Sequence, residues 1–217
     1  EAFGTNRAER VSRLEESIAL MKELWTGEEV NHEGRHWTVR GGRVGITPVQ
    51  KPHPPIWLAA QSRGAVRRAA AIADACLLGP QPNWEDIDKL SDMYWEAIAE
   101  QPGKTGRLAA NRSISVARDR ETAVSEAIAA GEAKAGLYTN FKMQESTTVD
   151  FGLGGARDLA DWAIVGSPQD CAETIARSHR ENGIEHFGFA ALNLPKGKSA
   201  RLEYLQLVSE EVLPLLP

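Results

Sequence analysis

The segment AAQSRGAV, residues 59–66, holds the residues whose types and spacing best suit ligand chemistry in this chain. Ser62 stands where a helix N-cap is expected, between a short apolar run and an alanine-rich segment. If Arg63 is the first helical residue, the amides of Gly64 and Ala65 lack intrahelical acceptors, and the helix terminus adds partial positive charge. Gly64 leaves room for close approach, and Arg63 can add a full charge. These features predict a phosphate cradle at the carboxyl end of a buried strand.

Capping alone explains the same serine without any ligand. A turn from strand to helix in an α/β fold must satisfy the first helical amides, and serine is a favoured cap. By spacing alone, capping is therefore the simpler interpretation and phosphate binding is the alternative.

A second helix start is carried by GSPQDC, residues 166–171. Ser167 suits the N-cap, Pro168 suits the first helical position, and Asp170 stands three residues after the cap. This pattern predicts a capping box with a structural role rather than a ligand site.

The histidines give weaker signals for chemistry. His36 and Trp37 form a pair that could contact a substrate, although a half-buried packing pair is the commoner arrangement. His53 and His186 stand at the amino ends of expected strands, so structural roles are expected there. No metal-ligand spacing, Ser-His-Asp order, paired-carboxylate pattern or P-loop identifies a reaction.

Composition narrows the class of protein. The chain has 42% hydrophobic and 25% charged residues and a net charge of -5, with no basic stripe. Nucleic acid and anionic membranes are therefore poor candidate partners, and we expect a cytoplasmic enzyme or binding protein. Cys76 and Cys171 are the two cysteines, and we expect buried thiols rather than a disulfide or a metal site.

The periodicity of apolar residues predicts helices that alternate with short buried strands. The expected helices are 7–25, 62–73, 84–99, 121–135, 167–182 and 201–213. The expected strands are 56–60, 75–79, 113–117 and 186–192, with a hairpin or extended loop near 28–50. This order predicts an α/β protein with a parallel sheet. Four strands are too few for a closed eight-stranded barrel but enough for its later half.

We expect residues 1–217 to form a single domain. Within it, residues 137–155 show no clear period and contain the glycine-rich FGLGG, which makes this segment a candidate lid or substrate loop.

Three blocks of the sequence resemble the bacterial luciferase-like flavin-dependent oxidoreductases. They are RLEESIALMKELWTGEEVNHEGRHWTV (13–39), PVQKPHPPIWLAAQSRGAVRRAAAIADACLL (48–78) and VGSPQDCAETIARSHRENGIEHFGF (165–189). The resemblance implies a (β/α)8 TIM-barrel fold that binds reduced FMN, or deazaflavin F420, at the carboxyl ends of its strands.

The resemblance also assigns the turn after the fifth barrel strand to the flavin phosphate. Here that turn contains Gln61, Ser62, Arg63 and Gly64, followed by Ala65. Ser62 matches a serine of the family, whereas a hydroxyl found further along the turn in some members is replaced by Ala65 or Val66. A backbone amide or Arg63 would then compensate.

The same resemblance implies an incomplete barrel that lacks about the first four strands, so we expect either a fragment or a companion segment that completes it. The family's catalytic groups would lie in those strands, and no catalytic residue is assigned here. We expect a monooxygenase that uses reduced FMN and O2 on a small organic substrate, with a separate flavin reductase and a homo-oligomeric assembly. The alternatives are F420-dependent hydride transfer, and a flavin-binding protein or inactive barrel fragment.

Overall fold

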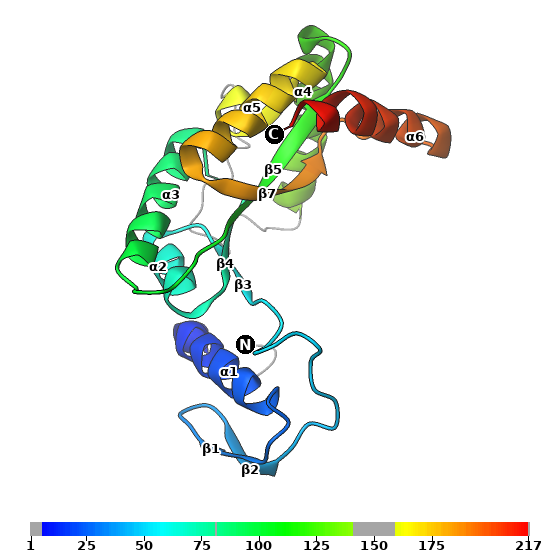
Figure 1. The fold of residues 1–217 in the computed structure, drawn as a ribbon. Helices are drawn as coiled ribbons and strands as arrows, with labels where there is room; N and C mark the ends of the chain where they lie inside the picture. Colours follow the sequence, from blue (N-terminus) through cyan, green and yellow to red (C-terminus); the bar gives the residue numbers. More distant parts are fainter. Residues whose placement is uncertain (1–5, 81, 141–158, 217) are drawn as a thin grey trace. The chain divides into compact units, whose positions relative to one another are not determined.

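The structure is a computed structural model that describes residues 6–80, 82–140 and 159–216; for residues 131–140 and 160 it describes the backbone alone (Figure 1). The chain divides into two compact units, Glu1–Ile56 and Trp57–Pro217. That the whole chain forms a single domain stays a prediction.

The first unit contains a helix and a hairpin, as the sequence predicts. The short 3-10 turn η1 (Arg7–Glu9) leads into helix α1 (Arg10–Leu24). Strands β1 (Val30–Glu33) and β2 (Thr38–Gly42) pair in antiparallel fashion, with a register irregularity between Val30 and His32.

Glu16 fastens this hairpin to α1. Its carboxylate accepts hydrogen bonds from the backbone amides of His36, at 3.0 Å, and Trp37, at 2.8 Å. The His36 side chain is only 3% exposed, and its Nε2 lies 2.7 Å from Ser12 Oγ on α1. Trp37 Nε1 donates to Ser17 Oγ at 3.0 Å. The structure therefore supports the packing interpretation of the His36–Trp37 pair.

The second unit is built on a five-stranded parallel sheet. Its strands are β3 (Trp57–Ala60), β4 (Ala75–Leu78), β5 (Leu108–Val116), β6 (Ala163–Gly166) and β7 (Ile184–Ala191). Strand β5 is central, because it pairs with β4, β6 and β7. The sequence located four of these strands, but it placed the start of β5 five residues too late and missed β6.

Helices follow the strands in alternation (Figure 1). They are α2 (Arg63–Ile72), α3 (Trp84–Ala99), α4 (Arg120–Asn140), α5 (Pro168–Asn182) and α6 (Lys198–Leu207), with the shorter η3 (Leu159–Asp161), η4 (Val208–Val212) and η5 (Leu213–Leu215). Because α4 continues to Asn140, residues 137–140 of the candidate lid are helical rather than irregular. The rest of that candidate lies outside the described residues.

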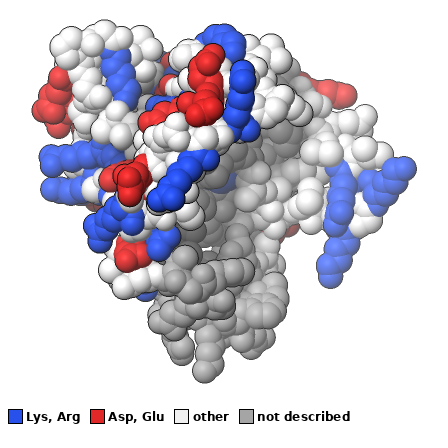
Figure 2. All heavy atoms as spheres, turned by 90° about the horizontal axis from the view of Figure 1, so that it is seen from below, with Lys and Arg blue, Asp and Glu red and all other residues white. Residues whose placement is uncertain are grey.

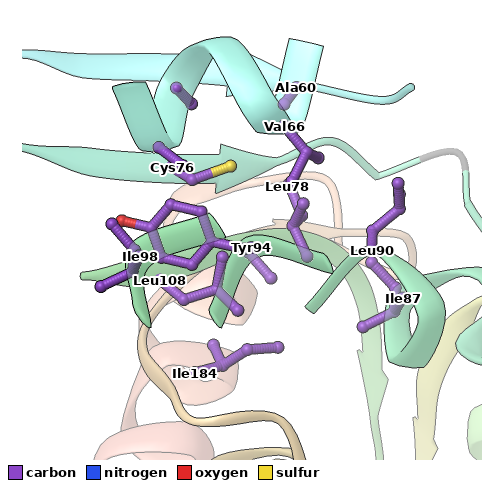
Figure 3. Close-up of a cluster of buried hydrophobic side chains, with 13 residues drawn as sticks. Ala60, Val66, Cys76, Leu78, Ile87, Leu90, Tyr94, Ile98, Leu108 and Ile184 are labelled. Atoms are coloured by element: carbon purple, nitrogen blue, oxygen red, sulfur yellow. The ribbon is translucent and has the colours of Figure 1, made fainter. Parts of the chain in front are cut away.

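The main core lies between α2, α3 and the sheet (Figure 3). Cys76 and Leu78 of β4, with Leu108 of β5, pack against Tyr94 and Ile98 of α3. Burial raises the pKa of the Tyr94 hydroxyl to about 12, and that hydroxyl accepts a hydrogen bond from the Arg107 amide at 3.1 Å. Alternation along each strand gives this layer one continuous apolar face.

A second cluster packs α5 and η4 against β6 and the carboxyl-terminal part of β5. Its members include Ile114 and Val116 of β5, Ile164 of β6, and Cys171 and Ile175 of α5. Both cysteines are buried free thiols, as the sequence predicts, and burial raises the pKa of each thiol to about 12.

The capping box at α5 yields a stability prediction. Ser167 Oγ accepts from the Asp170 amide at 3.3 Å, and Asp170 Oδ2 accepts from the Ser167 amide at 3.0 Å. Ser167→Ala should lower the free energy of unfolding by about 1 kcal/mol, because it removes one of these caps. Urea denaturation would measure the loss. Ser62→Ala is the matched control and should cost much less, because the Ser62 side chain makes no capping hydrogen bond; equal losses would contradict this prediction.

The contacts of Glu16 yield a pH prediction. Partial burial raises the pKa of this carboxyl, but hydrogen bonds from the His36 and Trp37 amides and from the His32 ring outweigh it, so the pKa is lowered. A lowered pKa stabilises the folded state above the ordinary carboxyl pKa, and this contribution is lost as the pH falls through the folded value. Amide protection factors of His36 and Trp37 should therefore fall as the pH is lowered through and below the ordinary glutamate pKa of 4.5.

Glu16→Gln should flatten this pH dependence, and Glu28→Gln, which removes an exposed carboxylate, should leave it unchanged. A Glu16→Gln chain that keeps the full acid dependence would refute the assignment to Glu16.

Candidate functional site

The predicted phosphate turn lies at the carboxyl edge of the sheet. Strand β3 ends at Ala60 and α2 begins at Arg63, so Gln61 and Ser62 form the turn. All strands of the sheet run parallel, which places this turn at the edge where α/β proteins commonly bind ligands. The prediction that the bend joins the end of a strand to the start of a helix is confirmed. The expected burial of this strand is wrong, because Trp57 and Ala59 are exposed and only Ala60 is buried.

Ser62 is the N-cap residue of α2, but its side chain does not cap. Its backbone is extended, with φ -146° and ψ 158°, and its carbonyl accepts the first helical hydrogen bond from the Val66 amide at 2.9 Å. Its hydroxyl makes no capping hydrogen bond. The amides of Arg63, Gly64 and Ala65 are therefore left without a side-chain cap at the positive end of the helix dipole.

Helices α3 and α5 use their N-termini differently. Asn83 Oδ1 accepts from the Asp86 amide at 2.8 Å, and Ser167 caps α5 through the box with Asp170. Both of these helices also carry a carboxylate in the first turn, whereas α2 carries none. A carboxylate near a helix N-terminus offsets the dipole and competes with an external anion. The structure confirms the capping box at Ser167 and leaves the start of α2 available.

The space in front of α2 is open. A methyl group added to Gly64 would meet no atom within 4 Å. Ser62, Arg63 and Gly64 are exposed together at this turn, while Ala65 is half-buried and packs against the main core. The described residues therefore leave the side-chain position of Gly64 open.

Gln61 lies beside the cradle rather than in front of it. Its side chain lies over Gly79, the first residue after β4, so closely that a methyl group on Gly79 would overlap the Gln61 amide. The Gly79 amide donates to the Ala60 carbonyl at 3.3 Å, which joins the ends of β3 and β4. The five predicted residues thus form one continuous turn, with Gln61 directed across the neighbouring strand.

Arg112 was not identified from the sequence. It is fully buried on the helix-facing side of β5, where its Nη1 donates to the Pro82 carbonyl at 2.7 Å and its guanidinium lies 4.2 Å from the Trp84 ring centroid. Its Nε and Nη2 have no hydrogen-bond partner among the described residues. Burial lowers the pKa of Arg112 to about 10. These contacts tie β5 to Pro82 and to Trp84 at the start of α3.

The sheet has a second face, opposite to the one that packs against α2 and α3. On β3 and on the first residues of β5, the side chains of this second face belong to none of the buried hydrophobic clusters. Leu58 and Ala60 of β3 face the core, so Trp57 and Ala59 face the other way; on β5, Ala109 and Asn111 do the same. The Trp57 and His186 rings stack across this face, with centroids 5.4 Å apart. His186 therefore has a packing role at the amino end of β7, as expected.

Acidic and basic side chains are interspersed over the described residues that Figure 2 shows. Among the residues with described side chains, no group of three or more His, Cys, Asp and Glu is placed to hold a metal ion. No helix within the described ranges combines the length and apolarity that a membrane span requires.

Comparison with known structures places the fold. A monooxygenase, RslO1 from Streptomyces bottropensis, superposes with TM-score 0.72 and 23% identity over 98% of this chain and 64% of that one. The oxygenating constituent of 3,6-diketocamphane monooxygenase from Pseudomonas putida, in complex with FMN, superposes with TM-score 0.69 and 18% identity. This match covers 94% of this chain and 62% of that one. The F420-dependent tetrahydromethanopterin reductase from Methanopyrus kandleri superposes with TM-score 0.68 and 18% identity. This match covers 94% of this chain and 63% of that one.

These likenesses confirm the predicted fold class, a parallel α/β sheet that corresponds to part of a TIM barrel. The chain spans less than two thirds of the length of these similar structures. A family model described as luciferase-like monooxygenase matches residues 1–186. This match covers most of the sequence, and the chain therefore belongs to the luciferase-like monooxygenase family.

Proposed function

We propose that this chain provides the phosphate site of a flavin-dependent oxidoreductase, a monooxygenase that uses reduced FMN and O2 on a small organic substrate. One observation carries the proposal. The first turn of α2 follows a parallel strand, is not capped by the Ser62 side chain, contains no carboxylate, and is open in front of Gly64.

The residues present suit a phosphate monoester. The Ser62 hydroxyl, the amides of Gly64 and Ala65 and the Arg63 guanidinium are all donors, and hydrogen bonds to an ionised phosphate are about twice as strong as neutral ones. The dipole of α2 favours the same charge. Bound FMN would supply the redox chemistry, while this turn holds the cofactor by its phosphate and so positions its ring.

F420 is the second candidate cofactor, because its phosphodiester could use the same donors. The fold supports it to the same degree, since both an FMN complex and F420-dependent enzymes are similar structures. FMN is preferred because its terminal phosphate carries more charge at the helix end, and because the net charge of -5 disfavours the acidic tail of F420. A separate flavin reductase, a homo-oligomer and a lid at 137–155 remain parts of the proposal.

The cradle can be tested by comparing two ligands that differ only in the phosphate. Ser62→Ala combined with Gly64→Asp should weaken FMN binding about 10- to 100-fold, because it removes a charge-assisted hydrogen bond and adds a repelling carboxylate. Riboflavin binding should change little. Quenching of flavin fluorescence in titrations of the full chain would measure both affinities.

Gly45→Asp is the matched control, because Gly45 is also exposed and an added side chain there meets no atom within 4 Å. It should leave both affinities unchanged. Equal losses of FMN and riboflavin in the Ser62/Gly64 variant would contradict the phosphate assignment. Parallel titration of the unsubstituted chain with F420 decides between the cofactors, because tighter binding of F420 would exclude the FMN preference.

A further inference from the structure

Asn111 is a polar side chain in the middle of the sheet that no other described residue satisfies. It lies on β5, paired with Gly188 of β7, and its side chain is half-buried. It makes no side-chain hydrogen bond with any residue that the structure describes. A carboxamide carries two donors and an acceptor, and a half-buried one without partners leaves all of them available to a ligand.

Glycines clear the space around this amide. The register places Ala60, Leu78 and Ala110 side by side, so its continuation places Gln61, Gly79 and Asn111 in the next row, and Gly188 completes that row. The Gln61 side chain lies over Gly79, and the Asn111 side chain lies over Gly188 so closely that a methyl group there would overlap its Oδ1. Both carboxamides therefore lie along one row at the carboxyl edge.

The next row on the same face consists of Ala59, Leu77 and Ala109 and continues to His186 of β7. Ala59 is exposed and Leu77 is half-buried, whereas Ala109 is buried within the chain. With strands about 4.8 Å apart, Asn111 lies roughly 10 Å across the sheet from the strand that leads to Ser62. A planar ring joined to a phosphate by a ribityl chain can therefore lie along these rows while its phosphate occupies the start of α2.

We propose that the Asn111 carboxamide hydrogen-bonds the imide edge of the flavin ring, which makes Asn111 a ring-binding and orienting residue. The imide offers an N–H between two carbonyls, and a carboxamide can accept from that N–H while donating to one carbonyl. Ala59 and Leu77, which are not fully buried, would contact the apolar part of the ring. This inference rests on the proposed function, and it applies equally to the deazaflavin of F420, which has the same imide edge.

Phosphate-free ligands separate this proposal from the cradle. Asn111→Leu should weaken riboflavin and FMN by the same factor, about tenfold, because the lost hydrogen bonds go to the shared ring. It should also shift the absorption band of bound riboflavin and lower its reduction midpoint potential, because a hydrogen bond to a ring carbonyl stabilises the reduced form. Ser62→Ala with Gly64→Asp should instead affect FMN alone.

Gly188→Ala provides a second variant that keeps Asn111 but displaces its amide. As a single substitution, Gly188→Ala should reduce the affinity for riboflavin. Added to Asn111→Ala, it should cause no further loss. The control substitution Gly45→Ala should leave the affinity for riboflavin unchanged in both backgrounds. Unfolding midpoints would identify any variant that fails to fold. If Asn111→Leu does not fold, the riboflavin affinity of Gly188→Ala tests the proposal, and the reverse holds if Gly188→Ala does not fold.

Unchanged riboflavin affinity and spectrum in Asn111→Leu would overturn the proposal, as would a loss confined to FMN. Failure of the unsubstituted chain to bind riboflavin would also overturn it, while the cradle would still be judged by FMN. Asn111→Leu would also be titrated with the phosphate-free deazaflavin chromophore of F420. A loss of affinity equal to that for riboflavin would support recognition of the imide edge.

Discussion

The hydrogen-bond ladders of β5 are the constraint on which this structure depends. Strand β5 pairs in parallel with β4, β6 and β7, so it sets the register of segments that are far apart in the sequence. Parallel ladders bring the carboxyl ends of strands to one edge, where the turn at Ser62 lies. They also align Gln61, Gly79 and Asn111 into one row. A shift of one residue would turn the apolar face away from the helices, and burial of that face therefore protects the row as well.

The two faces of the sheet divide stability from binding. On the helix side, Cys76, Leu78 and Leu108 are completely buried, and burial of a side chain of this kind typically contributes about 1.5–3 kcal/mol. Arg112 is the exception on this side, since a desolvated guanidinium is costly unless its partners compensate. Its stacking on Trp84 and its hydrogen bond to Pro82 offset part of that cost and tie β5 to the start of α3. Near Ala59 and Asn111 the opposite face has small side chains and an amide that no described residue satisfies, which contribute little to folding, whereas further along this face Ala163 and Val165 of β6 pack against α4.

The local patterns were predictable from the sequence, and the long-range ones were not. The capping box at Ser167 depends on residues only three apart, so its residue types suffice to identify it. At the start of α2, Ala65 occupies the position that Asp170 has in α5, so a capping box cannot form there. Strand β6 was missed although it is as short and as apolar as β3 and β4, which the sequence located. The roles of Arg112 and Asn111 depend on strand register, which periodicity does not specify, and the expected start of β5 excluded both.

The start of α2 and the Asn111 side chain share one physical property, namely polar groups that no described residue satisfies. At α3 and α5 the helix N-termini are satisfied from within the chain, by Asn83 and by the Ser167–Asp170 box, and an incoming anion would have to displace those contacts. At α2 no such contact must be broken, so the free energy of an amide–phosphate hydrogen bond is available for binding. The same argument applies to Asn111, whose amide exchanges only water for a ligand. Binding at both places would thus use donors that the folded chain already holds in position, and little of the binding free energy would be lost to reorganisation.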